Sequence, residues 1–266
     1  MGRAYPEGAR TYEALLTRAR DDPAILAFWL GGSRGMGRPT EHSDWDVGIL
    51  VTEDAYEPFC REIGLEGPFQ ADWRPGVDLM VRTLPMFEAF GAWESDERAY
   101  RYAYAHLTAL VDKTGRAQPM IDAKACVPAD AVPGFIHASL DHALNQAYRA
   151  LKCLRDGDPV ASRLEAADGV NPYFDAVFAL HGGRLRPYAK YLRWELETWP
   201  LARLPTGDAA LMDRALGVLG RDGGPTLSTL LAEARVAFRA AGQGAAYDGW
   251  GETLDWILTG RPDATP

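Results

Sequence analysis

The sequence predicts an α+β protein, with a mixed β-sheet domain over residues 1–127 followed by an α-helical bundle over residues 128–266. In the first part, short apolar runs alternate with helical patterns, as expected for a sheet covered by helices. Beyond two closely spaced prolines, Pro128 and Pro133, the apolar residues recur only at helical spacing. A chain of 266 residues is long enough to bury a separate core in each part.

The expected elements follow in chain order. A short amphipathic helix over residues 10–20 comes first, and its pattern stops at Asp21-Asp22-Pro23. Apolar runs then predict four strands, over residues 25–30, 47–51, 76–81 and 107–111. Helical periodicity predicts five helices in the second part, over residues 135–155, 161–180, 187–199, 209–219 and 227–240.

A glycine-serine turn follows the first predicted strand, at Gly31-Gly32-Ser33. Glycine lets the backbone approach a phosphate closely, and exposed amides in such a turn form a concave site for anions. Ser33 adds a hydroxyl donor. The turn is therefore a candidate phosphate site.

Two carboxylates stand one residue apart just before the second strand, at Asp44 and Asp46, after ten residues that separate them from Ser33. Residues i and i+2 of a strand point to the same face, so both carboxylates are expected to point together. Paired oxygen donors of this kind hold Mg²⁺, which takes its other ligands from water and substrate phosphates. Asp78 interrupts the third apolar run, where a charge is costly to bury without a partner. A metal-binding or proton-transfer role explains Asp78 better than packing does.

These three segments resemble the motifs of the nucleotidyltransferase superfamily of DNA polymerase β, and in particular the bacterial aminoglycoside and lincosamide nucleotidyltransferases. The family pattern is a hydrophobic residue, glycine, and glycine or serine, then Asp-hydrophobic-Asp-hydrophobic, and a third Asp on a later strand. Leu30 to Ser33, Asp44 to Val47 and Val77 to Leu79 match it, and the resemblance extends over residues 25–115.

The resemblance implies that ATP, or another nucleoside triphosphate, donates a nucleoside monophosphate to a hydroxyl group. Asp44, Asp46 and Asp78 would bind Mg²⁺, and Asp78 would also help to remove the acceptor proton. Gly32 and Ser33 would hold the terminal phosphates. Many relatives read Gly-Ser-x-Ala-Arg-Gly at the turn, whereas this chain shifts the arginine, so Arg34 and Arg38 are either phosphate ligands or solvated loop charges.

The basic residues of the second part are closest together in the segment Arg184 to Tyr191. Pro187 suits the first turn of a helix, which would put Arg186, Lys190 and Arg193 on one helix face. Relatives often contact the nucleotide through a lysine of the helical domain, and Lys190 matches best. The alternative interpretation is a solvated basic face.

The acceptor side is less specific. Glu94 and Glu97 follow the third strand, where an acid would act as general base near the acceptor hydroxyl. The segment Trp93 to Arg98 also reads as a charged helix start, because acidic residues are favoured at the positive end of the helix dipole. We favour the helix start. In a homodimer, a neighbouring subunit would supply the missing acid.

Charge and composition narrow the class of partner. With 28 basic and 37 acidic residues the net charge is −9, and no basic block offsets it, which argues against nucleic acid. An acidic surface favours a cationic small acceptor such as an aminoglycoside. The chain has neither a long apolar span nor an apolar leader, and its three cysteines lack metal or disulfide spacing, so a cytoplasmic protein without membrane contact is expected.

Two other functions use the same motifs. An antitoxin-like nucleotidyltransferase would adenylylate a protein, although such proteins are usually much shorter than this chain. A regulatory module would bind the nucleotide without turnover, although a degenerate member would be expected to have lost at least one carboxylate.

Overall fold

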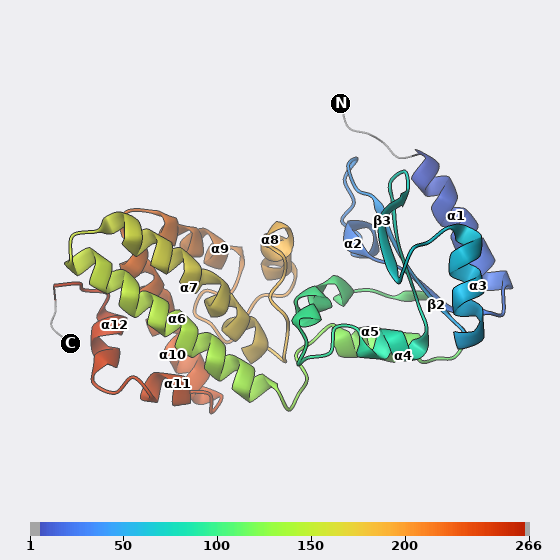
Figure 1. The fold of residues 1–266 in the computed structure, drawn as a ribbon. Helices are drawn as coiled ribbons and strands as arrows, with labels where there is room; N and C mark the ends of the chain where they lie inside the picture. Colours follow the sequence, from blue (N-terminus) through green and yellow to red (C-terminus); the bar gives the residue numbers. More distant parts are fainter. Residues whose placement is uncertain (1–5, 264–266) are drawn as a thin grey trace. The chain divides into compact units, whose positions relative to one another are not determined.

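The computed structural model describes residues 6–263 and divides into two compact units, residues 1–126 and 127–266. The first unit contains a five-stranded mixed sheet with helices, and the second is helical (Figure 1). The α+β class predicted from the sequence is therefore confirmed.

The first unit follows a βα pattern around its sheet. Its elements are α1 (Pro6–Asp21), β1 (Ile25–Leu30), α2 (Gly32–Gly35), β2 (Trp45–Val51), α3 (Glu53–Ile63), β3 (Phe69–Arg74), β4 (Val77–Arg82), α4 (Leu84–Ala89), the 3-10 helix η1 (Asp96–Tyr104), β5 (Ala109–Asp112) and α5 (Ala117–Lys124). The strand order is β3-β4-β2-β1-β5. The central pair, β2 and β4, is parallel, and the other three pairs are antiparallel, so the sheet is mixed.

One face of the sheet packs on the core beneath α1 and α3. Alternate residues of β2 and β4, including Val47, Ile49, Val77 and Leu79, belong to this core, together with Leu16 of α1. Because side chains alternate along a strand, the residues between them face the opposite side. That second face therefore carries Asp46 and Asp78, near the beginning of β2 and β4.

Close packing of an aromatic ring shapes the middle of the second face. Trp29 of β1 lies across Gly48 of β2, where a Cβ would come within 2.1 Å of the indole. The ring also contacts Phe87 of α4, with centroids 5.1 Å apart, and Phe87 in turn contacts Tyr104. Gly48 is thus required by the close approach of Trp29.

Three buried cations, Arg82, Arg101 and Lys124, lie beyond this aromatic layer. Lys124 donates to the carbonyls of Glu88 and Phe90, and Arg101 donates to those of Gly91, Ala123 and Cys126. The guanidinium of Arg82 lies over the Phe90 ring, 3.6 Å from its centroid. Burial, together with the charges of Arg101 and Arg82, lowers the pKa of Lys124 to about 8.

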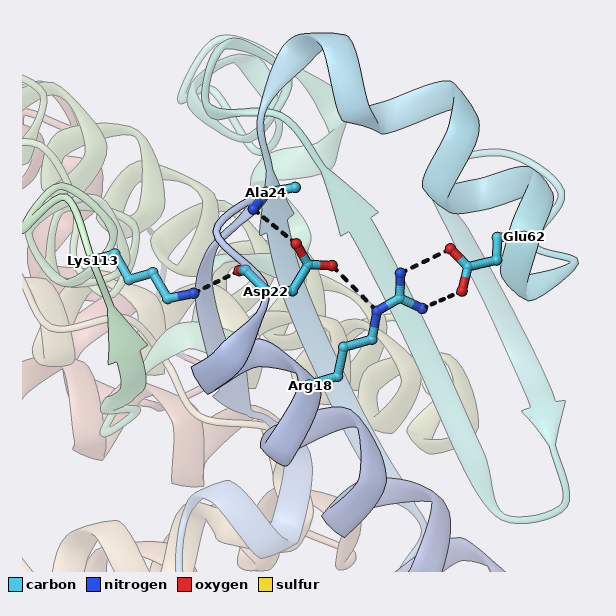
Figure 2. Close-up of polar contacts among 5 residues, drawn as sticks. All are labelled: Arg18, Asp22, Ala24, Glu62 and Lys113. Atoms are coloured by element: carbon cyan, nitrogen blue, oxygen red, sulfur yellow. Dashed lines mark hydrogen bonds and ion pairs between the residues drawn. The ribbon is translucent and has the colours of Figure 1, made fainter.

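A polar network joins the end of α1 to α3 and β5 (Figure 2). Arg18 donates to both carboxylate oxygens of Glu62, at 2.8 and 2.9 Å, and also to Asp22. The Asp22 side chain accepts from the amide of Ala24, and its carbonyl accepts from Lys113. The forked Arg18 contact orients α1 against α3, although such exposed pairs add little stability.

The strand β3 was missed by the sequence analysis, which expected four strands. Its segment, Phe69–Arg74, has no apolar run, and most of its residues are exposed because β3 is an edge strand. Pro75 and Gly76 connect it to β4, and Gly76 has a φ of +74°. A turn of this kind requires glycine.

The second unit is a bundle centred on two long antiparallel helices. Its elements are α6 (Val132–Arg155), α7 (Pro159–Leu180), α8 (Ala189–Thr198), α9 (Ala209–Leu216), the 3-10 helix η2 (Gly217–Leu219), α10 (Gly223–Ala240), α11 (Ala245–Asp248) and α12 (Thr253–Thr259). Asp158 caps α7 by accepting from the amides of Val160 and Ala161, ahead of a proline at the first turn. The short helices α11 and α12 were not predicted.

Two general expectations can be compared with the structure. Among the described residues, no helix is long and apolar enough to cross a membrane. The cysteines are free thiols, with Cys60 buried and Cys126 and Cys153 partly exposed.

Candidate functional site

Asp46 and Asp78 are neighbours across the two central strands. In the parallel pairing of β2 with β4, Asp46 is opposite Asp78, just as Trp45 is opposite Val77. Residues opposite each other in register project to the same face, so the two carboxylates lie side by side on the second face of the sheet. Asp44 lies two residues before Asp46, at the entrance to β2.

The glycine turn packs directly against Asp46. Gly32 has a φ of +55°, and a Cβ at this position would lie 1.8 Å from Oδ2 of Asp46. The amide of Gly31 donates to the Asp46 carbonyl at 2.6 Å. Glycine is therefore needed at position 32 for two reasons, the left-handed backbone and the contact with the carboxylate.

Arg34 braces the segment that leads to Asp44. Its Nε donates to the Asp44 carbonyl and its Nη2 donates to the Ser43 carbonyl, both at 2.9 Å. The guanidinium also lies over the Trp45 ring, 4.2 Å from its centroid, and Tyr12 stacks on that ring at 4.4 Å. These contacts give Arg34 a structural role, whereas its contact with a phosphate stays a prediction.

Ser33 belongs to a small hydroxyl network around Ser43. The Ser33 hydroxyl donates to Oγ of Ser43 at 2.7 Å, and the same Oγ accepts from the amide of Thr40 at 2.8 Å. The loop closes further through the amide of Arg38, which donates to the Ser33 carbonyl. Ser43 is buried, so it fixes the loop from inside.

The surroundings of Asp78 shift the pKa of its carboxyl upward from the ordinary value. Burial raises the pKa of the Asp78 carboxyl, and the nearby charges of Asp44 and Asp72 raise it further. A hydrogen bond from the amide of Asp72 to Oδ1, at 2.7 Å, opposes the rise.

The donor atoms suit Mg²⁺, although they do not form a complete cage. Within residues 6–263, no three His, Cys, Asp or Glu residues gather closely enough to hold a metal ion. Mg²⁺ is commonly held by one or two carboxylates together with substrate phosphates and water. Asp46 and Asp78 are adjacent carboxylates of this kind, and Asp44 lies two residues before Asp46. Their binding of Mg²⁺ stays a prediction.

The basic segment of the second unit does not form the predicted helix face. The helix α8 begins at Ala189, so Pro187 and Arg186 lie before it. Arg186 pairs with Asp175 at 2.8 Å, and Arg193 pairs with Asp213 at 2.5 Å. The prediction of one face for all three residues was therefore wrong for Arg186, because the residue before a proline is held out of helical conformation. Lys190 and Arg193 lie three residues apart on α8. Lys190 is exposed in the first turn of α8, and its nucleotide contact stays a prediction.

The acidic segment after β4 is a helix start, as the sequence analysis favoured. Asp96 and Glu97 lie in the first turn of η1, with Ser95 before it. Glu97 also accepts a hydrogen bond from the amide of Gly91, and Glu94 is exposed. The structure thus gives Glu97 a task in closing the loop.

Two residues that contact the site, Asp72 and Ser43, were not predicted from the sequence. The backbone amide of Asp72, on strand β3, donates to the Asp78 carboxylate, and the Ser43 hydroxyl links Ser33 to Thr40. Ser43 immediately precedes the Asp44-Trp45-Asp46 motif, and Asp72 precedes a Pro-Gly turn. Asp and Ser beside turns commonly bond local backbone groups, which was the available signal.

Comparisons with known proteins do not assign an activity. No family model matches the chain, and no curated protein matches its sequence. Among solved structures, the chain is similar to a nucleotidyltransferase-like protein from Exiguobacterium sibiricum 255-15, with 9% sequence identity and a TM-score of 0.44 over 95% of this chain and 86% of that one. The chemistry therefore has to be derived from the residues of the site.

Proposed function

We propose that this protein transfers a nucleoside monophosphate from a nucleoside triphosphate, with ATP as the first candidate, to a hydroxyl group of a small molecule. The observation that supports it most is the adjacency of Asp46 and Asp78 on parallel strands, with the Gly31-Gly32 turn packed against Asp46. Two oxygen donors for a divalent cation thus stand beside a loop whose glycines let a phosphate approach the backbone.

In the proposed reaction the three carboxylates bind the metal ion, and Asp78 also accepts a proton. Asp44, Asp46 and Asp78 would hold Mg²⁺, which supplies charge neutralisation at the phosphate oxygens when it is bound. Asp78 accepts the proton of the acceptor hydroxyl as its oxygen attacks the α-phosphorus. The bond from the α-phosphorus to the bridging oxygen breaks, and pyrophosphate leaves.

The loop residues would orient the triphosphate. Gly32 and Ser33 border the carboxylates, and Arg34 and Lys190 are the candidate cations that would neutralise charge on the leaving pyrophosphate. Because Arg34 already donates to two backbone carbonyls, its main effect would be to hold Asp44 in place.

The acceptor is proposed to be a cationic or neutral small molecule. A net charge of −9 attracts cations and repels nucleic acid. Aminoglycosides carry several ammonium groups with hydroxyl groups beside them, and lincosamides offer hydroxyl groups on a smaller frame. Both classes belong in the first acceptor screen.

Nucleotide binding is the first test of the proposal. Purified protein would be titrated calorimetrically with non-hydrolysable ATP, GTP, CTP and UTP analogues, with and without Mg²⁺. We expect Mg²⁺-dependent binding of at least one analogue. Asp46→Asn should reduce this affinity by about tenfold or more, because it removes one carboxylate ligand of the metal ion.

A matched control separates the site from general charge effects. Asp21→Asn removes an exposed carboxylate of the same unit and should bind as the wild type does. Pyrophosphate release would then be followed with each acceptor class. Binding that is equal in Asp46→Asn and Asp21→Asn would reject the metal assignment, and no binding of any analogue by the wild type would reject the transferase.

A further inference from the structure

Asp72 has an unusual backbone conformation. Its φ is +49°, and among the described residues the only other non-glycine residue with a positive φ is His106. Aspartate tolerates this left-handed region better than most residues, but the conformation still costs energy. Contacts with neighbouring residues must therefore hold Asp72 in this conformation beside the candidate site.

The conformation arises from a bulge in β3 opposite Asp78. Gln70 pairs with Leu79, and Arg74 pairs with Val77, so β3 spans four steps where β4 spans two. The two extra residues take the amide of Asp72 out of the regular ladder. It donates instead to Oδ1 of Asp78, at 2.7 Å. Bulges of this kind redirect groups beside functional sites.

Contacts on both sides of the bulge hold Asp72 in place. Its own carboxylate accepts from the amide of Gly76 at 3.0 Å. On the other side of the strand, the buried indole of Trp73 donates to the carbonyl of Ile63 at 3.1 Å. The Asp72 amide is therefore fixed relative to the core of the unit.

The turn at Pro75-Gly76, which follows the bulge, also fixes the start of β2. The carbonyl of Gly76 accepts from the amide of Trp45 at 2.9 Å, and Trp45 stands between Asp44 and Asp46. One turn thus connects all three carboxylates. The amide of Asp72 donates a hydrogen bond to Asp78, and the carbonyl of Gly76 accepts one from the segment that contains Asp44 and Asp46.

We propose that Asp72 is a positioning residue, which uses its left-handed backbone and its bond to Gly76 to hold the Asp78 carboxylate beside Asp44 and Asp46. It does not bind the nucleotide or the acceptor. The consequence for turnover rests on the function proposed above, whereas the Asp72–Asp78 bond can be tested by itself.

The chemistry of the side chain predicts a graded series of variants. Asp72→Asn keeps an acceptor for Gly76 and tolerates a positive φ, so it should retain positioning. Asp72→Gly keeps only the backbone freedom, and Asp72→Val loses both, since a β-branched residue strongly disfavours this region. Asp21→Val is the control for a general effect of replacing an exposed aspartate in this unit.

The first measurement tests the bond without any activity. Hydrogen exchange of the Asp72 amide would be followed by NMR in the wild type and in Asp78→Ala, with Tm recorded for each. We expect exchange to speed up by about tenfold or more when the acceptor is removed, while the amides of the β2–β4 ladder keep their protection. Unchanged exchange at Asp72 would overturn the proposal.

The second measurement tests the consequence for the site. Affinity for Mn²⁺ would be measured by electron paramagnetic resonance, together with kcat and KM for the nucleotide. We expect the order wild type and Asn, then Gly, then Val, with a loss in kcat on the order of 100-fold at the end of the series and little change in KM. Rescue by Asn distinguishes positioning from a catalytic carboxylate.

The outcomes separate the two proposals. If the wild type binds neither Mn²⁺ nor nucleotide, the proposed function fails, and the amide exchange alone decides the role of Asp72. If the wild type is active and Asp72→Val matches it in kcat and Mn²⁺ affinity, the positioning role is rejected while the transferase stands. An inactive Asp72→Asn that keeps its Tm and its amide protection would also reject positioning, because it would make the carboxylate itself catalytic.

Discussion

Gly32 packs against the carboxylate of Asp46 so closely that a Cβ at position 32 would lie only 1.8 Å from Oδ2 of Asp46. The turn after β1 and the carboxylate on β2 therefore fit together only if residue 32 has no side chain. This contact connects the two halves of the sequence motif physically. A substitution in the turn is expected to act through the carboxylate.

Gly32→Ala should abolish transfer and destabilise the first unit. The new methyl group displaces the Asp46 carboxylate, and the left-handed φ adds strain of about 1 kcal/mol or more. We expect at least a 100-fold loss of kcat with a decrease in Tm of several degrees, measured by pyrophosphate release and by calorimetry. Gly37→Ala is the matched control, because Gly37 has a φ of +69° and open space around it. Equal losses in both variants would show that backbone strain alone is responsible.

Arg34→Lys distinguishes bracing from phosphate binding. Lysine keeps the positive charge but cannot donate to two carbonyls in a fork or stack flat on Trp45. If Arg34 braces Asp44, the variant should lose Mg²⁺ affinity by about tenfold, as measured by the Mg²⁺ dependence of the rate. The phosphate role predicts a smaller effect in Arg34→Lys than in Arg34→Met. Arg38→Lys, in the exposed part of the same loop, serves as the comparison.

Lys124 should make the protein more stable as the pH rises from about 8 to about 10.5. Its pKa in the folded protein is about 8, below the ordinary value of 10.5, because burial and two neighbouring arginines disfavour its charge. The stability that it contributes is therefore present in full above about pH 10.5 and is lost as the pH falls through about 8. We expect the Tm of the wild type to rise relative to Lys124→Met by about 5 °C between pH 7.5 and pH 10.

The control for this pH dependence is Lys152→Met. Lys152 lies on α6, is partly exposed and contacts the ring of Tyr148. Its variant should differ from the wild type by a constant amount over the same pH range. A constant difference for Lys124→Met as well would mean that the amine is not desolvated in the folded protein.

The apolar core of the sheet was predictable because burial imposes a pattern on the sequence. The runs at 25–30 and 47–51 coincide with β1 and the buried part of β2, and the alternation around Asp78 matches β4. The bundle was predictable for the same reason, through helical periodicity from α6 to α10. In each case local sequence and tertiary burial agree.

The parts that were missed depend on contacts between distant residues. The edge strand β3 is mostly exposed, so burial imposes no pattern on Phe69–Arg74, and its bulge depends on pairing with β4. The carbonyl contacts of Arg34 exist only once the loop has folded back on Ser43. The sequence indicated a strand for Asp46 and another for Asp78, whereas the pairing of these two strands is seen only in the structure. The roles of these carboxylates remain predictions until they are measured.

Asp78→Asn should stabilise the metal-free protein while it abolishes transfer. Burial raises the pKa of the Asp78 carboxyl above its ordinary value of 3.8, so ionisation of this group opposes folding. The stability associated with its neutral form is present in full below about pH 3.8 and is lost as the pH rises through the raised pKa. Asparagine stays neutral at every pH, and its Oδ1 can still accept from Asp72. We therefore expect a Tm gain of a few degrees at pH 7 in the presence of a chelator, shrinking towards pH 4, with Asp21→Asn showing no such trend. If the variant were less stable than the wild type at both pH values, the charge on Asp78 would have to be stabilised by its surroundings, and the upward shift of its pKa would be rejected.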